Sequence, residues 1–357
     1  MMNTNLIPAR APSPGRIIRR ELEARGWTQK DLATIMDRPE QSISQIVKAR
    51  KKITSETALQ LAAAFGTSAD FWLNLESSYQ IYQARKTHNA SKIERRSRLY
   101  SLAPVTELLR RGWIAAGDSL DDLETAVCQF LGIEDPTQTP HLAVNFHHSD
   151  SYTPELAAQI AWVKRVEQLA EMQVVEDFDR SRLEEALPEL LAFAANVEDL
   201  QKIPDFLKRL GVHFLIVPHL PNTYLDGATF MLGDHPVVAL TLRHNRIDNF
   251  WFILMHELAH IISGHTGIYL DNLEKEAVDS DEIEANRLAQ AWLVDTTMLK
   301  RFVAENAPRF SREKIVAFAE TQNRHPGIVV GQLHYAKAVP YRNFRPFLVK
   351  VSSYFQF

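Results

Sequence analysis

The sequence predicts a mainly helical protein with one small β-sheet, that is, an α+β fold divided into domains. Capped segments of helical periodicity fill the first 85 residues, and an apolar run at residues 250–262 is long enough for a buried helix. Three strand-like runs precede that helix, at residues 212–217, 228–232 and 237–242. A chain of 357 residues suits two or three domains. We expect an all-α bundle over residues 1–85, a helical connector over 86–200 and a mixed domain over 201–357.

Composition places the chain among ordinary globular proteins, with 45% hydrophobic and 24% charged residues. The formal net charge of -4 gives no global field that marks a nucleic-acid binder. Cys128 is the lone cysteine, which rules out an internal disulfide framework and suits a reducing compartment. No stretch has the pattern of a signal peptide or a membrane span. These observations predict a cytoplasmic protein that does not contact membranes.

Five short helices are predicted between Pro14 and Arg85. Residues that favour helix starts mark four of them, at Thr28, at Pro39, at Thr54 or Ser55, and at Ser68. The second and third helices are separated only by Asp37-Arg38-Pro39, which is the spacing of a helix-turn-helix. In that motif the helix after the turn presents its N-terminal residues to a DNA major groove.

Local charge supports DNA binding by this segment. Residues 10–52 contain eleven basic and five acidic residues, a local balance of +6 within an acidic protein. Gln41 and Gln45 lie one turn apart on the expected outward face, where glutamine can pair with adenine. A bundle used only for dimerisation is the alternative, and a homodimer is expected if the motif reads two half-sites. The candidate DNA contacts are Gln29, Glu40, Gln41, Ser44, Gln45 and Lys48.

The apolar run contains His256, Glu257 and His260 at the spacing HExxH. Residues four apart share one face of a helix, so both histidines can bind a single metal ion, with Glu257 as general base for a water molecule. We expect Asp248 or Asn249 to cap this helix, which ends at Ser263-Gly264. The alternative is a chance pattern in a core helix, but three unpaired polar groups there would cost about 1 to 3 kcal/mol each.

A catalytic zinc ion needs a third protein ligand and an open position. Glu284 repeats with Leu288 and Trp292 at helical spacing, which predicts that Glu284 lies on the buried face of the next helix and completes the site. Asp281 could orient a ligating histidine, and Glu282 is expected on the wetter side. An acidic, solvated helix start is the alternative for the acidic residues of this segment. Ligand type favours Zn²⁺ without excluding manganese or iron.

Gly233-Asp234 joins the second and third strand-like runs and predicts a β-hairpin. An edge strand beside a metal helix can pair with an extended peptide and present its scissile carbonyl group. The group that stabilises the resulting oxyanion is left open. The candidates are His265, Tyr269, His325 and Tyr335.

Longer stretches resemble two known families. Leu225-Asp226-Gly227-Ala228, residues 246–251, the HELAH run, Glu284-Ala285-Asn286 and residues 325–331 resemble the ImmA/IrrE family of gluzincin-type metallopeptidases, over about residues 203–333. The resemblance implies a gluzincin-like zinc peptidase domain, with zinc held by His256, His260 and Glu284 and with Glu257 as catalytic base. Members of this family are associated with the cleavage of repressors of the XRE type.

The first domain resembles the XRE-type DNA-binding domain, in particular its HigA-like antitoxin branch. The residues that carry this resemblance are Pro14-Gly15-Arg16-Ile17-Ile18, residues 27–33, Gln41-Ser42-Ile43-Ser44 and residues 71–75, within about residues 14–82. Trp72 is expected in the core.

Together these features predict a transcriptional regulator that binds operator DNA and cleaves a regulatory protein in response to stress or metal availability. The alternative is a HigA-like antitoxin or repressor that binds a toxin and whose metal domain senses or scaffolds without hydrolysis. The intact Glu257 favours hydrolysis, because a structural zinc site needs no base.

Overall fold

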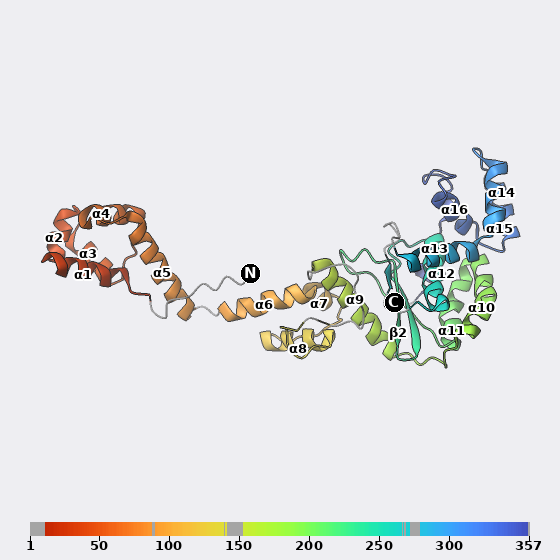
Figure 1. Cartoon of the computed structure of the whole chain (residues 1–357), viewed down its shortest axis with the longest axis horizontal. Helices are drawn as coiled ribbons and strands as arrows, with labels where there is room; N and C mark the ends of the chain where they lie inside the picture. The colour runs from red at the N-terminus through yellow and green to blue at the C-terminus, as the bar shows by residue number, and fades with distance from the viewer. Residues whose placement is uncertain are drawn as a thin grey trace. The chain divides into compact units, whose positions relative to one another are not determined.

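The computed structural model describes residues 11–87, 90–138, 140, 153–265, 267, 269–271 and 279–355. The chain divides into two compact units, residues 1–95 and residues 96–357 (Figure 1). Most of the elements are helices, and one sheet lies in the second unit, so the predicted α+β class is confirmed. Within the described residues, no helix is long and apolar enough to cross a membrane.

Five helices form the first unit up to residue 87: α1 Pro14–Arg25, α2 Gln29–Ile35, α3 Glu40–Val47, α4 Ser55–Phe65 and α5 Ala69–Thr87. The predicted helix starts are confirmed. Thr28 and Asp31 form a reciprocal capping box at α2, and the hydroxyl of Thr54 accepts a hydrogen bond from the amide of Thr57 at α4. At α5 the Ser68 hydroxyl accepts from the amide of Phe71.

The helices of the first unit pack closely around an apolar core. A Cβ atom at Gly15 would lie 2.1 Å from the carbonyl oxygen of Val47, so glycine allows α1 to approach the end of α3. Trp72 is fully buried, and its indole N–H donates to the Thr67 hydroxyl at 2.7 Å. The prediction that Trp72 belongs to the core is confirmed.

The sheet of the second unit has four strands in the order β1-β3-β2-β4. They are β1 His213–Ile216, β2 Gly227–Leu232, β3 His235–Leu240 and β4 Tyr269–Asp271. β1 and β3 are parallel, whereas β2 pairs antiparallel with both β3 and β4. The predicted hairpin is confirmed, with Leu232 opposite His235 across Gly233-Asp234. β4 was not predicted.

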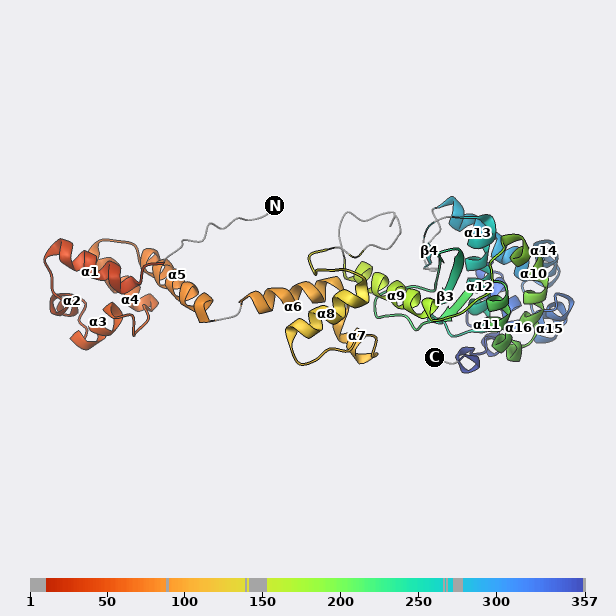
Figure 2. The ribbon, with the colours of Figure 1, turned by 90° about the horizontal axis from the view of Figure 1, so that it is seen from below.

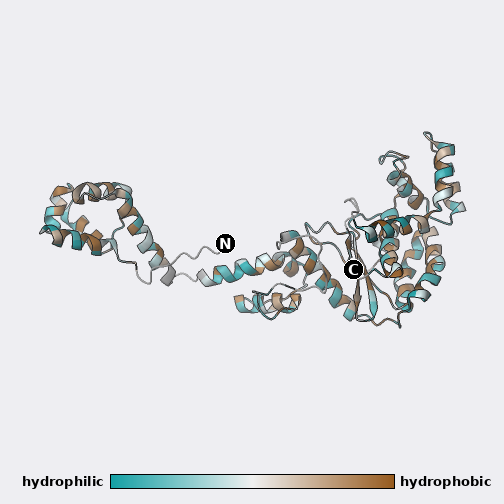
Figure 3. Cartoon of the chain, viewed as in Figure 1, coloured by the Kyte–Doolittle hydropathy of each residue, from teal (hydrophilic) through white to brown (hydrophobic). Residues whose placement is uncertain are grey.

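Helices cover both faces of the sheet (Figures 1 and 2). On one face Ala228, Phe230, Val237 and Ala239 share a core with α9 and with the helices before it. These helices are α6 Ala90–Leu102, α7 Val105–Arg110, α8 Leu120–Leu131 and α9 Pro154–Glu171. Hydrophilic residues dominate the beginning of α6 (Figure 3). We predicted a domain boundary near residue 200, but the helices of residues 96–200 belong to the same compact unit as the sheet.

The other face carries the largely buried helix α12 Ile247–Ser263 together with the remaining elements. Phe214, Val238 and Leu240 point from the sheet into this core. The surrounding elements are α10 Arg180–Ala192, α11 Ile203–Arg209, α13 Ser280–Leu293, α14 Thr296–Asn306, α15 Arg312–Thr321 and α16 Pro326–Tyr335, with short 3₁₀ turns at Phe193–Ala195, Val197–Lys202, Arg345–Phe347 and Ser352–Tyr354.

The predicted start of α12 was wrong. The helix begins at Ile247. Its N-cap residue is Arg246, whose side chain forms no capping hydrogen bond with the first turn. Asp248 lies in the first turn, where its carboxylate accepts hydrogen bonds at 3.0 and 3.1 Å from the Arg246 guanidinium. This bidentate ion pair competes with capping for the carboxylate, and it holds the negative charge of Asp248 near the helix N-terminus.

Candidate functional sites

Helix α12 brings the two histidines of the HExxH pattern together inside the protein. His256 and His260 have no exposed surface, and their Nε2 atoms are 3.1 Å apart. This proximity follows from their spacing, because residues four apart project from the same face of an α-helix. Two ring nitrogens are therefore directed at one point.

Helix α13 supplies the carboxylate that faces this point, and it is Glu282. Its Oε2 lies 3.2 Å from His256 Nε2, and its Oε1 lies 3.6 Å from His260 Nε2. Among the residues that the structure describes, His256, His260 and Glu282 are the one group arranged to hold a metal ion.

Glu284 lies outside this group. Its side chain is 49% exposed, against 23% for Glu282, so the predicted burial of Glu284 was wrong. The buried stripe of α13 runs through Ala285, Ala289 and Leu293. Glu282 precedes Ala285 by three residues and shares that stripe, whereas each step of one residue turns the helix by about 100° and moves Glu284 away.

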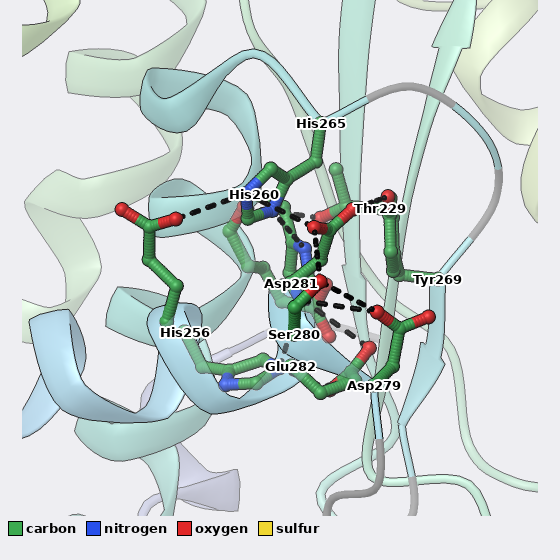
Figure 4. A network of polar contacts seen from close by, with 11 residues as sticks. Thr229, His256, His260, His265, Tyr269, Asp279, Ser280, Asp281 and Glu282 are labelled. Atoms are coloured by element: carbon green, nitrogen blue, oxygen red, sulfur yellow. Dashed lines mark hydrogen bonds and ion pairs between the residues drawn. The ribbon is translucent and has the colours of Figure 1, made fainter.

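The donor set fits a tetrahedral metal ion. Zinc binds imidazole nitrogen and carboxylate oxygen at about 2.0–2.2 Å, which separates the ligand atoms by about 3.4 Å. The distances of 3.1, 3.2 and 3.6 Å lie around that value. Figure 4 shows His256, His260 and Glu282 within one polar network.

Glu257 is fully buried between α12 and β2. A Cβ atom at Gly227 would lie 2.1 Å from its Oε1, so the carboxylate occupies the space that a side chain on β2 would fill. The Thr229 hydroxyl donates to the main-chain carbonyl of Glu257 at 3.4 Å. The second strand therefore fixes the position of this residue from the sheet side.

The oxyanion candidates fall into different surroundings. Tyr269 stacks on His260, with ring centroids 4.0 Å apart, and Nδ1 of His265 lies 3.0 Å from Nδ1 of His260. Tyr335 is largely exposed and stacks on Phe252. His325 caps α16 by accepting from the Gly327 amide, and burial lowers the pKa of His325.

Electrostatic interactions tie Tyr269 to Asp281. The Tyr269 hydroxyl donates to Asp281 Oδ2 at 2.8 Å. That hydrogen bond is the main reason why the pKa of Asp281 is lowered, and burial, followed by the same bond, raises the pKa of Tyr269. Asp281 thus remains a carboxylate beside the metal-binding group.

The candidate DNA contacts lie on α2 and α3. Glu40, Gln41, Gln45 and Lys48 are exposed, while Gln29 and Ser44 are partly buried. Ile43, Ile46 and Val47 occupy the opposite, buried side of α3. The helix therefore presents one polar face to solvent.

Two segments match known families. Residues 18–72 match the helix-turn-helix family, and residues 207–309 match the IrrE N-terminal-like domain, a peptidase family. The first segment contains the candidate DNA contacts, and the second contains His256, His260 and Glu282.

Individual relatives match the first segment. Virulence-associated protein I of Dichelobacter nodosus is 33% identical over 81 residues, which are 22% of this chain and 75% of that protein. Antitoxin HigA-1 of Vibrio cholerae is 31% identical over 80 residues, again 22% and 75%. The solved structure of Pseudomonas aeruginosa antitoxin HigA with the higBA promoter is 32% identical and covers 24% of this chain and 92% of that one, with a TM-score of 0.23.

Proposed function

We propose that the chain is a DNA-binding regulator with a zinc-dependent endopeptidase activity, because its first domain belongs to the XRE-type helix-turn-helix family and residues 207–309 match the IrrE N-terminal-like peptidase family. The observation that carries the proposal is the convergence of His256, His260 and Glu282 in a buried site beside Glu257. We assign the third ligand to Glu282 in place of Glu284.

The residues of the site have separate tasks in this reaction. When bound, zinc polarises the scissile carbonyl group and lowers the pKa of water. Glu257 accepts the proton of the attacking water and passes it to the leaving amine. Its burial against Gly227 holds the carboxylate in one place.

The sheet provides a place for the substrate. β4 is one of the two edge strands in the order β1-β3-β2-β4, and its Tyr269 stacks on His260. An extended peptide that pairs with this edge would run past the metal-binding group. Tyr269, held by Asp281, is close enough to the group to remain a candidate for oxyanion stabilisation.

In the first unit, α3 is the recognition helix. Gln41 and Gln45 are exposed on it and suit base contacts, while Lys48 suits a phosphate. We expect a homodimer that binds two half-sites of an operator. A mobility shift on the DNA upstream of the gene tests this part, and loss of the shift in Gln41→Ala, Gln45→Ala would support it.

Metal content tests the peptidase part most directly. Wild type should contain about one zinc per chain, and His260→Ala and Glu282→Ala should lose it. Arg287→Ala serves as the matched control, because Arg287 is exposed on the same helix and lies outside the group. A metal-free but folded wild type would refute the zinc assignment.

Cleavage tests the reaction. The first substrate to try is an XRE-type repressor or this chain itself, because the peptidase family that the last domain resembles is associated with the cleavage of such repressors. Glu257→Gln should retain zinc and lose cleavage by a factor of about 10² to 10⁴. If wild type and Glu257→Gln act alike on the repressor, the endopeptidase proposal fails.

The similarity to HigA-1 favours a second candidate, a HigA-like antitoxin whose metal domain does not hydrolyse peptides. This candidate predicts that a toxin co-purifies with the chain and that the chain does not cleave it. The Glu257→Gln variant separates the two candidates. Under this candidate it behaves as wild type does, including repression of its promoter. Under the first candidate it loses the cleavage that wild type shows.

A further inference from the structure

His260 is contacted on both of its ring nitrogens. Its Nε2 faces His256 Nε2 at 3.1 Å, and its Nδ1 lies 3.0 Å from Nδ1 of His265. The two nitrogens of an imidazole point in different directions, so His265 contacts the nitrogen that the metal would not use. His265 is therefore placed behind the proposed ligand, and it cannot bind the same ion from this position.

The helix end determines where His265 lies. Gly264 has φ 73° and ends α12 in the left-handed conformation, and the His265 amide donates to the His260 carbonyl at 3.0 Å. This turn carries the chain back over the last turn of the helix. A residue without a Cβ atom is favoured there, because L side chains rarely adopt this φ.

The surroundings of His265 favour one of its two neutral tautomers. Its Nε2 lies 3.6 Å from Glu284 Oε2 and 3.8 Å from Asp281 Oδ1, and its side chain is only 9% exposed. A proton on Nε2 faces these two carboxylates, which leaves Nδ1 as an acceptor. His260 then donates from Nδ1–H and keeps the lone pair on Nε2 for a cation.

Tyr269 packs against one face of the His260 ring. Its ring lies 22° from the plane of His260 at a centroid distance of 4.0 Å, and its hydroxyl is held by Asp281. The ring of His260 thus contacts a stacked tyrosine on its face and a hydrogen-bond partner at Nδ1. Figure 4 shows His260, His265, Tyr269 and Asp281 together.

From this geometry we infer that His265 is a positioning residue: it accepts a hydrogen bond from His260 Nδ1–H and thereby holds His260 in the tautomer and orientation that bind the metal. The inference rests on the proposed zinc site and extends it to a residue outside the ligand set. Partners of ligating histidines typically change metal affinity 10- to 100-fold when they are removed.

Two substitutions separate hydrogen bonding from simple packing. In His265→Asn the side-chain oxygen lies the same number of bonds from the backbone as Nδ1 does, so an acceptor is retained. In His265→Leu a methyl group takes that place, and Nδ1–H of His260 loses its acceptor. The two variants thus differ mainly in one acceptor atom.

The measurement is the dissociation constant for Zn²⁺ of the full-length chain, by competition with a chromogenic chelator, with thermal unfolding of the metal-free forms as the folding check. We expect His265→Leu to bind Zn²⁺ about 10- to 100-fold more weakly than wild type and His265→Asn to recover most of that loss. Equal affinity of wild type and His265→Leu would overturn the inference. Equal weakening in both variants would overturn it too, because the acceptor would then be irrelevant.

Failure of the zinc site itself gives a different result. If wild type binds no Zn²⁺ in the same competition assay, the proposed function is wrong, and His265 has no ligand to position. If wild type binds Zn²⁺ tightly and only the His265 comparison fails, the metal site stands and the positioning role is rejected.

Discussion

Gly227→Ala tests the position of the proposed general base without touching a metal ligand. The new Cβ atom would lie 2.1 Å from Oε1 of Glu257 and 2.7 Å from a methyl carbon of Ile253. Ordinary contacts of a Cβ atom begin near 3.4 Å. The Glu257 carboxylate must therefore move by about 1.3 Å, and misplacement by about 1 Å can cost a factor of about 10² in rate.

Stability should fall as well, since overpacking a filled site typically costs about 1 to 3 kcal/mol in the free energy of unfolding. Urea denaturation of the full chain measures this loss, and cleavage assays measure the rate. Zinc content should remain at the wild-type level, because His256, His260 and Glu282 are not displaced directly.

A double-mutant cycle gives a readout that needs no substrate. In a Glu257→Ala background the carboxylate is gone, so Gly227→Ala should destabilise the protein less than it does in wild type. Gly331→Ala is the matched control: its Cβ atom would lie 2.6 Å from that of Asp248, away from the base. It should lose stability and keep its cleavage rate. If Gly227→Ala is as stable and as active as wild type, the described position of Glu257 is refuted.

Three further outcomes are expected. Thr28→Ala removes half of the capping box with Asp31 and should lower the unfolding free energy of the first unit by about 1 kcal/mol, measured by urea denaturation. A hydrogen bond from the Arg110 guanidinium lowers the pKa of Glu107 to about 2. The stabilisation of the folded state by the charged Glu107 is complete above the ordinary carboxyl pKa and is lost as the pH falls toward 2. In Glu107→Gln the unfolding temperature should therefore fall less steeply over that pH range than in wild type. Gln45→Ala should weaken operator binding by about 1 to 3 kcal/mol if it reads a base, measured by mobility shift at fixed salt.

Local patterns predicted much of this molecule correctly. The helix starts at Thr28 and Thr54 follow from side chains that bond amides three residues ahead, and the hairpin follows from Gly233-Asp234 between two apolar runs. The approach of His256 to His260 follows from helical spacing alone. Each of these features is decided within a few residues of the chain.

Features that depend on packing were missed. The rotation of α13 decides whether Glu282 or Glu284 meets the histidines, and the prediction took the large Leu288 and Trp292 as the buried side. The helix instead buries Ala285 and Ala289, whose small side chains let its backbone approach its neighbour. The three-residue β4 is too short to show a period, and the packing of α9 against the sheet is a contact between distant segments.

The placement of the third carboxylate on a separate helix has a thermodynamic consequence. His256 and His260 belong to α12 and Glu282 to α13, so an ion held by all three would act as a cross-link between two helices that already pack against each other. Ligand binding to the native state alone adds about 2.7 kcal/mol of stability when the free ion is at 100 times its dissociation constant. Metal supply would thereby set the resistance of this region to unfolding and proteolysis, apart from any effect on catalysis.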